Sequence, residues 1–171
     1  NNEDGTKFLL YHAEDVIDFA WSASPHFSLV EKNLDGLNIK LYIYPQKEYL
    51  SDRILNAAEY TFNYLENTIG DYPYPYFTII DPPRNALRSG GMEYPTFITT
   101  LSIWGIPENI KFMEETTIHE ILHNYFQAML ASNEFEEPWL DEGFTQYFET
   151  RIMDETYGTN ESRIDLFGLQ I

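Results

Sequence analysis

The stretch MEETTIHEILHNYFQAML, residues 113–130, most constrains what this chain can fold into. Its apolar residues recur at steps of four, three and four, the spacing of one face of an α-helix: Ile118, Leu122, Tyr125 and Met129. Glutamates fall early in the stretch, where the helix dipole favours negative charge. We therefore predict a helix that runs from after Pro107 to about Ala131.

This helix carries the motif HEILH. His119 and His123 are four residues apart, so their rings point to the same side of the helix. Such a pair supplies two of the three protein ligands that a catalytic zinc ion needs. Glu120 is rotated about 100° around the helix, beside the metal rather than on it, where it can take a proton from a water bound to the metal.

A second helix is predicted to supply the third ligand. It begins near Pro138, a residue suited to the first turn, and carries the sequence WLDEGF. An antiparallel return after a short loop brings Glu142 beside the two histidines, whereas Asp141 faces about 100° away and is not expected to be a ligand. Glu149 lies seven residues further on the same face and is placed to accept the free N–H of a ligand histidine.

The segments before this helix predict a small sheet. Residues 36–45 alternate apolar and polar side chains, as a strand with one buried face does. Residues 51–69 carry an apolar stripe with helical spacing. Residues 76–80 and 96–101 are apolar or β-branched and predict two more strands, with a loop over residues 81–91 between them. Strands followed by long helices predict the α+β class.

The composition excludes several kinds of function. The chain has 171 residues, a formal net charge of −18 and no cysteine. This charge repels nucleic acid and anionic membranes, and the lack of cysteine excludes disulfides and thiolate zinc sites. No apolar run reaches the length of a membrane span. The compartment and the oligomeric state stay open. His12 and His26 have no partner at a useful spacing, and we expect them to be surface or packing residues.

Taken together, these motifs resemble the aminopeptidase N family of gluzincins, zinc metallopeptidases with a thermolysin-like catalytic domain. The family pattern is HExxH, eighteen residues and a glutamate, which matches His119 to His123 and Glu142. The segment GGMEY, residues 90–94, is similar to the G-x-M-E-N motif of the family. The resemblance implies that Glu93 binds the free α-amino group of the substrate. Gly90 and Gly91 would let the backbone run beside an extended substrate.

The resemblance covers roughly residues 40–157 and implies a domain division. Residues 1–37 are expected to lead in from a preceding β-sandwich domain, and residues 38–171 to form the first part of a thermolysin-like catalytic domain. The helical lobe that follows in the family, and its transition-state tyrosine, are expected to lie outside this chain. The chain therefore has the marks of a truncated fragment that is inactive alone. Tyr94 departs from the asparagine of the family motif.

The predicted function is that of a zinc-dependent metallopeptidase, an aminopeptidase that acts on peptides with a free N-terminus and binds one Zn²⁺ per chain. Two alternatives stay open. Tyr94 could alter the amine-binding loop, which would give an endopeptidase or a peptidase of different specificity. The same fold could also serve as a peptide-binding or scaffolding module without catalysis.

Overall fold

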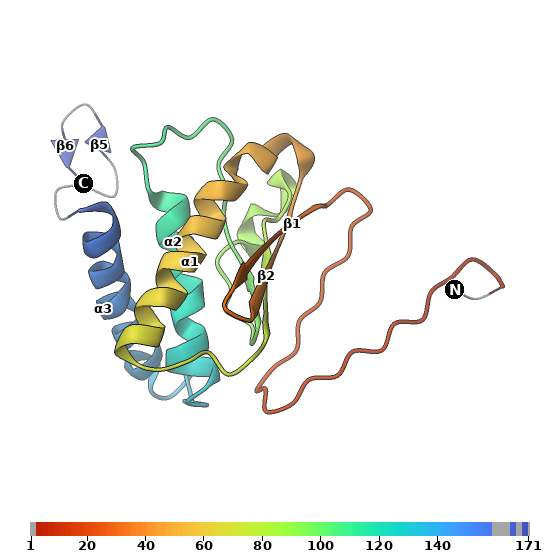
Figure 1. The fold of residues 1–171 in the computed structure, drawn as a ribbon, viewed down its shortest axis with the longest axis horizontal. Coiled ribbons are helices and arrows are strands. Elements are labelled where there is room, and N and C mark those ends of the chain that lie inside the picture. The colour runs from red at the N-terminus through yellow and green to blue at the C-terminus, as the bar shows by residue number, and fades with distance from the viewer. Residues whose placement is uncertain (1–2, 159–164, 167–168, 171) are drawn as a thin grey trace.

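A four-stranded sheet with helices packed on one face forms the body of the protein (Figure 1). The computed structural model describes residues 3–158, 165–166 and 169–170. The strands lie in numerical order, with β1 antiparallel to β2 and the other neighbours parallel: β1 Ser28–Leu34, β2 Leu37–Ile43, β3 Tyr76–Ile80 and β4 Phe97–Thr99. This arrangement confirms the predicted α+β class and the three predicted strands.

Strand β1 is an element that our sequence analysis did not predict. It forms a hairpin with β2 through the two-residue turn Asp35-Gly36, whose φ angles of 42° and 106° are both positive. Two positive φ angles are the mark of a type I′ turn, for which Asp-Gly is a preferred sequence. The hairpin spans residues 37 and 38, where the lead-in was expected to meet the catalytic domain. The domain division itself stays a prediction.

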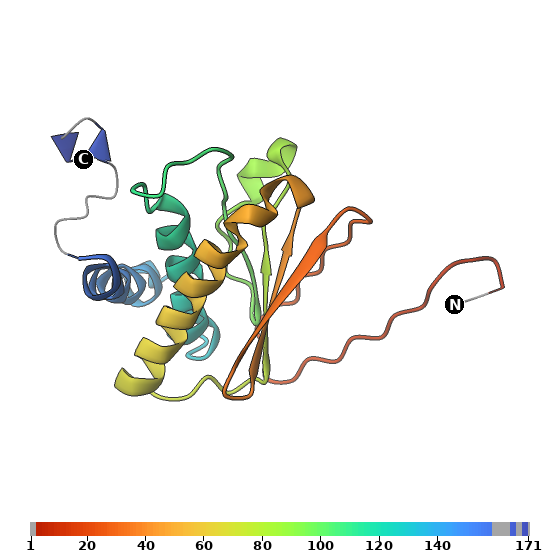
Figure 2. The same ribbon diagram turned by 45° about the horizontal axis from the view of Figure 1, so that its top comes forward.

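Three helices lie on one side of the sheet, the last of them packed mainly on the second, while the N-terminal segment runs along the other side (Figure 2). Helix α1 packs on α2, and α2 packs on α3. The helical elements, including two 3₁₀-helices and one π-helix, are η1 Pro45–Leu50, α1 Ser51–Thr68, η2 Arg84–Ser89, α2 Phe112–His123, η3 Asn124–Ala128 and α3 Pro138–Tyr157. Residues 165–166 and 169–170 pair as the short strands β5 and β6.

The helix predicted from after Pro107 to Ala131 differs from this prediction in two ways. Its α-helical part begins only at Phe112, and from Asn124 the backbone changes to the wider π-helical hydrogen-bond pattern. A single π-helical turn within a helix is uncommon and is frequently found at functional sites. The spacing of apolar residues cannot show this change, because over a single turn an α-helix and a π-helix place apolar residues at nearly the same intervals.

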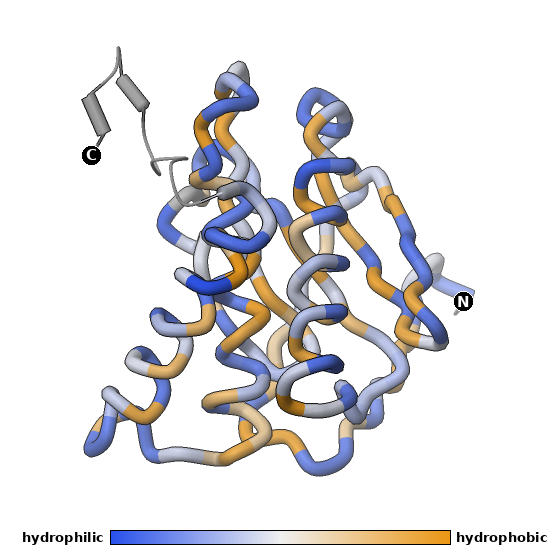
Figure 3. Tube along the Cα trace, turned by 60° about the vertical axis from the view of Figure 1, so that its left-hand side comes forward, coloured by the Kyte–Doolittle hydropathy of each residue, from blue (hydrophilic) through white to orange (hydrophobic). Residues whose placement is uncertain are grey.

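The hydrophobic core lies between the sheet and the helices. Strand β2 buries every second residue. Figure 3 shows hydrophobic positions interleaved with hydrophilic ones along both coiled and extended parts of the chain. The largest fully buried apolar side chains come from the strands and from α1 and α2: Ile39, Leu41, Ile43, Phe77, Ile79, Ile98, Ile54, Leu65, Met113, Ile118, Ile121 and Leu122. Each contributes about 1.5–3 kcal/mol through its burial. The core therefore fixes one face of α2 and leaves its other face for the histidines.

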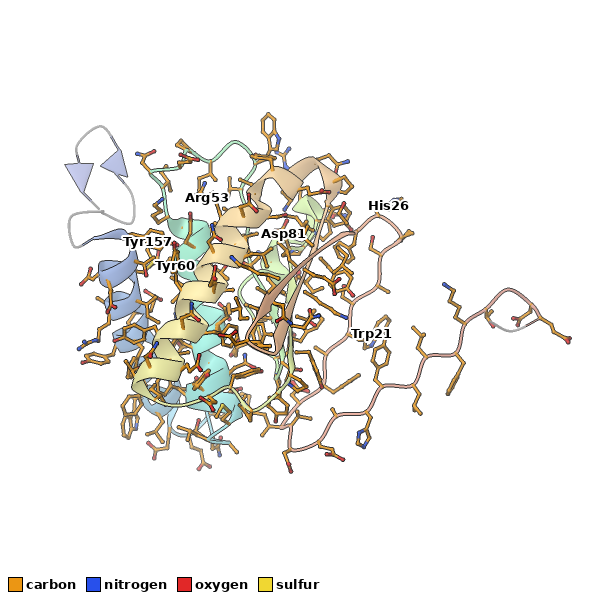
Figure 4. The ribbon with its side chains drawn as sticks, in the orientation of Figure 1. Trp21, His26, Arg53, Tyr60, Asp81 and Tyr157 are labelled. Atoms are coloured by element: carbon orange, nitrogen blue, oxygen red, sulfur yellow. The ribbon has the colours of Figure 1, made fainter. Side chains whose placement is uncertain are left out.

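A buried ion pair fixes the start of α2 against α1. The guanidinium of Arg53, labelled in Figure 4, donates from Nε to Glu114 Oε1 at 2.7 Å and from Nη2 to Glu114 Oε2 at 2.9 Å. Nη2 also donates to the carbonyl oxygen of Ile110 at 2.7 Å. Paired bonds of this kind are strong and directional. These bonds hold α2 in place at Glu114, which precedes His119 on the same helix.

None of the helices in the described part of the chain is long and apolar enough to cross a membrane.

Candidate metal centre

The two histidines of α2 meet at the surface that faces α3. Their Nε2 atoms are 3.0 Å apart, and their ring centroids are 4.7 Å apart. His123 is buried, with 2% of its surface exposed, whereas the side chain of His119 is 22% exposed. The spacing of four residues therefore brings two nitrogen donors to one point that solvent can reach.

Glu142 of α3 reaches the same point. Its Oε2 atom lies 3.5 Å from Nε2 of His119 and 3.9 Å from Nε2 of His123. Two ligands of a tetrahedral zinc ion, with bonds of about 2.0–2.1 Å, lie about 3.3 Å apart. The three donor atoms lie within 4.8 Å of one another and so fit a single ion of this size. A set of two imidazoles and one carboxylate is also the donor chemistry of catalytic zinc sites.

Both histidines are oriented by carboxylates on α3. Nδ1 of His119 hydrogen-bonds Oε2 of Glu149 at 2.7 Å, and Nδ1 of His123 hydrogen-bonds Oδ1 of Asp141 at 2.5 Å. When Nδ1 donates its proton to a carboxylate, the tautomer that results leaves Nε2 free to bind a metal ion. The hydrogen bonds therefore point both free nitrogens at the same place.

Asp141 is a site residue that our sequence analysis missed. Asp141 is rotated about 100° around α3 from Glu142, so its carboxylate does not face the Nε2 atoms of the histidines. The same rotation brings this carboxylate to Nδ1 of His123. Asp141 is 2% exposed, and the signal available in the sequence was only an acidic residue next to a ligand candidate. Thr145, one turn later, also lies 3.4 Å from this nitrogen.

Glu120 lies beside this centre in a buried position, with 6% of its surface exposed. Burial, together with the nearby carboxylates of Glu93 and Glu142, raises its pKa to about 8, although His119 acts in the opposite direction. A carboxyl group with a pKa near neutrality can both take up and release a proton during a reaction. This arrangement suits a general base.

The pKa of His119 is also shifted. Burial lowers it, but the hydrogen bond to Glu149 and the charges of Glu120, Glu149 and Glu142 outweigh burial, so the net shift is upward. An imidazole among carboxylates holds its proton more tightly when no cation is bound. The proton must leave before Nε2 can bind a metal ion.

The segment GGMEY lies directly against Glu120. Gly91 has a φ of 74°, and a Cβ atom there would stand 3.2 Å from Glu120 Oε1. A Cβ at Gly90 would stand 3.1 Å from the carbonyl oxygen of Thr100. Met92 bridges Thr99 of β4 in an antiparallel manner. The two glycines thus allow the backbone to pass close to the carboxylate and to the sheet edge.

Glu93 points toward the same centre. Its carboxylate forms a group with His123 and Asp141 in which the potential ligand atoms lie within 4.8 Å of one another. Burial raises the pKa of Glu93, although His123 lowers it in part. The structure therefore brings together His119, His123, Glu142, Glu120, Glu93 and Glu149, while their individual roles stay predictions.

The other two histidines lie elsewhere. His12 is exposed and 3.6 Å from Glu14. His26 is exposed on the N-terminal segment, on the opposite side of the sheet from α2 (Figure 4). Neither belongs to the metal centre.

Comparisons with known proteins identify the family. The profile of the "Peptidase family M1 domain" matches residues 53–170. "Leukotriene A-4 hydrolase" of Xenopus laevis is 31% identical over 138 residues, which cover 77% of this chain and 22% of that protein. Human "Aminopeptidase RNPEPL1" is 31% identical over 109 residues, and "Leucine aminopeptidase 2" of Neurospora crassa is 33% identical over 112 residues. Each of these two alignments covers 63% of this chain and 14% of the relative.

The chain thus spans less than a quarter of the length of these relatives. The family profile nevertheless covers well over half of the chain, and it includes both metal-centre helices and the segment GGMEY. The resemblance expected from the sequence motifs is confirmed. The chain belongs to peptidase family M1.

Proposed function

We propose that this chain carries the metal centre of a zinc-dependent aminopeptidase. Nε2 of His119, Nε2 of His123 and the carboxylate of Glu142 would hold the zinc ion. The observation that carries the proposal is the convergence of these three donors, with both Nδ1 atoms already engaged by carboxylates. When bound, zinc supplies Lewis acidity and lowers the pKa of water to about 7.

Glu120 acts as the general base. Its carboxylate takes a proton from the attacking water and delivers it to the leaving amine. The absence of a side chain at Gly91 leaves room for Oε1 of Glu120, because a Cβ atom there would stand only 3.2 Å from it.

Glu93 supplies the selectivity for a free N-terminus. A peptide α-amino group has a pKa of about 7.7–8.0 and is largely protonated at neutral pH, so a carboxylate beside the metal centre pairs with it. The proximity of Glu93 to His123 supports this role, because it puts the carboxylate beside the metal centre. The names of several relatives, which include aminopeptidases, support this substrate class.

The test is the substitution Glu120→Gln in the full-length protein. We expect the variant to keep one zinc ion per chain and to lose hydrolysis by at least about 100-fold, as removal of a general base does. Metal analysis and initial rates on a peptide with a free N-terminus measure the two quantities. Near wild-type turnover would contradict the assigned base, whereas loss of zinc would show that Glu120 serves the metal site instead.

A second candidate is an endopeptidase, and one observation favours it. Tyr94, next to Glu93, stands where the family motif has asparagine. Rates on a free peptide and on its N-acetylated form separate the two functions. Equal rates would favour the endopeptidase, while a strong preference for the free amine supports the aminopeptidase.

A further inference from the structure

The loop that carries Glu93 ends in a tight turn over residues 94–97. The amide of Phe97 donates to the carbonyl oxygen of Tyr94 at 3.0 Å, which closes the turn. Pro95 occupies the second position, and Thr96, in the third position, has a φ of 59°. Proline at the second position and a positive φ at the third are the marks of a type II turn.

Thr96 is an unfavourable residue for this conformation. The third position of a type II turn is normally glycine or asparagine, and a β-branched residue with a positive φ is a genuine outlier. A type I turn has the same ends but a negative φ at the third position, because the central peptide, Pro95–Thr96, is rotated by roughly 180°. Local preference therefore favours the other state of this peptide.

A contact from the metal-binding helix holds the observed state. Oδ1 of Asn124 accepts the amide N–H of Thr96 at 2.8 Å. This N–H belongs to the central peptide, and rotation to the type I state would turn it away from Asn124. The strain at Thr96 persists because this surrounding contact determines the conformation.

The side chain of Asn124 is itself held by burial and by further hydrogen bonds. It is 1% exposed and directly follows His123, at the start of the π-helical turn η3. Its Nδ2 donates to the carbonyl oxygen of Glu120 at 3.3 Å, and Tyr72 Oη donates to its Oδ1 at 3.4 Å. The side chain therefore connects the backbone of the HEILH motif to the turn that follows Glu93.

We propose that Asn124 is a positioning residue, which locks the Pro95–Thr96 peptide in the type II state and so sets Glu93 relative to the metal centre. This inference rests on the proposed function of Glu93 as the site for the substrate amine. In this role Asn124 affects the selectivity for a free N-terminus, through the position of Glu93, and not the chemical step. Peptide flips of this kind are two-state elements that a single hydrogen bond can bias.

The first test compares Asn124→Leu with Asn124→Asp in the full-length protein. Leucine has a similar size but no acceptor, whereas aspartate keeps an oxygen for the Thr96 amide. We expect N124L to raise KM for a free-amine peptide and to lower the rate ratio of free to N-acetylated peptide about tenfold, the effect of losing one buried hydrogen bond. The zinc content should stay unchanged, and N124D should restore most of the ratio.

Asn67→Leu is the matched control. Asn67 lies on the exposed side of α1, where its Nδ2 donates to the carbonyl oxygen of Asn63. The same substitution there should leave the ratio within about twofold of the parent. An N124L protein with the parent ratio would overturn the inference, as would equal losses in N124L and N124D.

A second variant tests the strain. Glycine adopts a positive φ without cost, so Thr96→Gly should return the ratio of the N124L protein to within about threefold of the parent. If Asn124 acted only by supporting the helix, glycine at position 96 would restore nothing. Failure of this rescue would contradict the two-state turn.

A third measurement does not depend on activity or on any variant. Amide hydrogen exchange of the parent protein should show the Thr96 N–H strongly protected, since it donates to a buried acceptor. An amide that exchanges as fast as an open loop would overturn the inference, even if N124L fails to fold. Protection at Thr96 without any hydrolysis of free peptides would instead leave the positioning contact standing and refute the proposed function.

Discussion

At the residue scale, Nδ1 of each imidazole in the centre is hydrogen-bonded to a carboxylate, and Nε2 could bind a metal ion. His123 and Asp141 are both almost completely buried, so neither exchanges its partner for water. His119 and Glu149 repeat the arrangement nearer the surface. Partners of this kind tune metal affinity as strongly as many direct contacts do.

The substitution Asp141→Asn tests this arrangement. We expect zinc affinity to fall about 10- to 100-fold, because the neutral amide no longer fixes the tautomer of His123 or increases its basicity. Competition with a chelator measures the affinity. Asp154→Asn, on the exposed side of the same helix, is the control and should bind zinc as the parent does; a D141N protein that does so too would refute the role.

Zinc binding should also depend on pH. Without a cation, the pKa of Glu120 is about 8, so this group holds a proton near neutrality, and the raised pKa of His119 lets its imidazole keep a proton to a higher pH than usual. Zinc requires a neutral His119 and favours an ionised Glu120, and binding therefore releases protons. Affinity should rise between pH 6 and pH 8 and level off above that range. Chelator competition at several pH values gives the slope, and a flat profile would show that neither group changes protonation.

At the element scale, the direction and height of α2 decide where the histidines lie. One face of the helix is held by the apolar core, and its start is held by the pair Arg53–Glu114. The guanidinium covers a glutamate side chain that is only 3% exposed. Loss of one partner from such a pair leaves an uncompensated charge in the interior.

We therefore expect Arg53→Met to lower the free energy of unfolding by about 3–5 kcal/mol. Urea denaturation measures this change, and a second substitution, Glu114→Gln, should recover part of the loss. Lys40→Met removes the exposed pair with Glu31, which are 3.8 Å apart, and should change stability by less than about 1 kcal/mol. Similar effects of R53M and K40M would mean that the buried pair adds nothing to the attachment of α2.

At the scale of the whole molecule, α3 differs from α1 in burying mainly polar side chains. Along one face it buries the polar residues Asp141, Thr145 and Glu149, which face the histidines, and towards its end it buries the apolar Ile152 and Met153. The first half of α3 is thus joined to the rest through the metal centre and through the ring of Phe144, which stacks on Phe126. A bound ion would link it to α2 through Glu142, and binding to the native state alone stabilises it.

Removal of zinc should consequently loosen α3 before it loosens the sheet. We expect amide exchange to increase over the first half of α3, while β2 and β3 keep their protection because their residues lie in the core. Hydrogen exchange with and without a chelator measures both regions in one sample. A uniform loss across helix and sheet would contradict this order.

Much of this molecule follows from short-range patterns in the sequence. The period of an α-helix brings His119 and His123 to one side, and the spacing to Glu142 returns the third donor on the next helix. Alternation along residues 37–43 predicts β2. The Asp35-Gly36 turn signal was available for the β1 hairpin, although a half-exposed strand gives a weak pattern. These features depend only on backbone geometry, which repeats over a few residues.

Other features were decided only by the tertiary structure. Whether Asp141 reaches His123 depends on how α3 rotates against α2, and a change of one helical position would separate them. The type II turn at Thr96 opposes local preference and exists because Asn124, far along the chain, accepts its amide. The sequence by itself determined which donors a metal ion could use. Packing between distant segments decided how those donors are oriented. The orientation depends on contacts between residues far apart in the chain, and the periodicity of a single helix or strand does not contain this information.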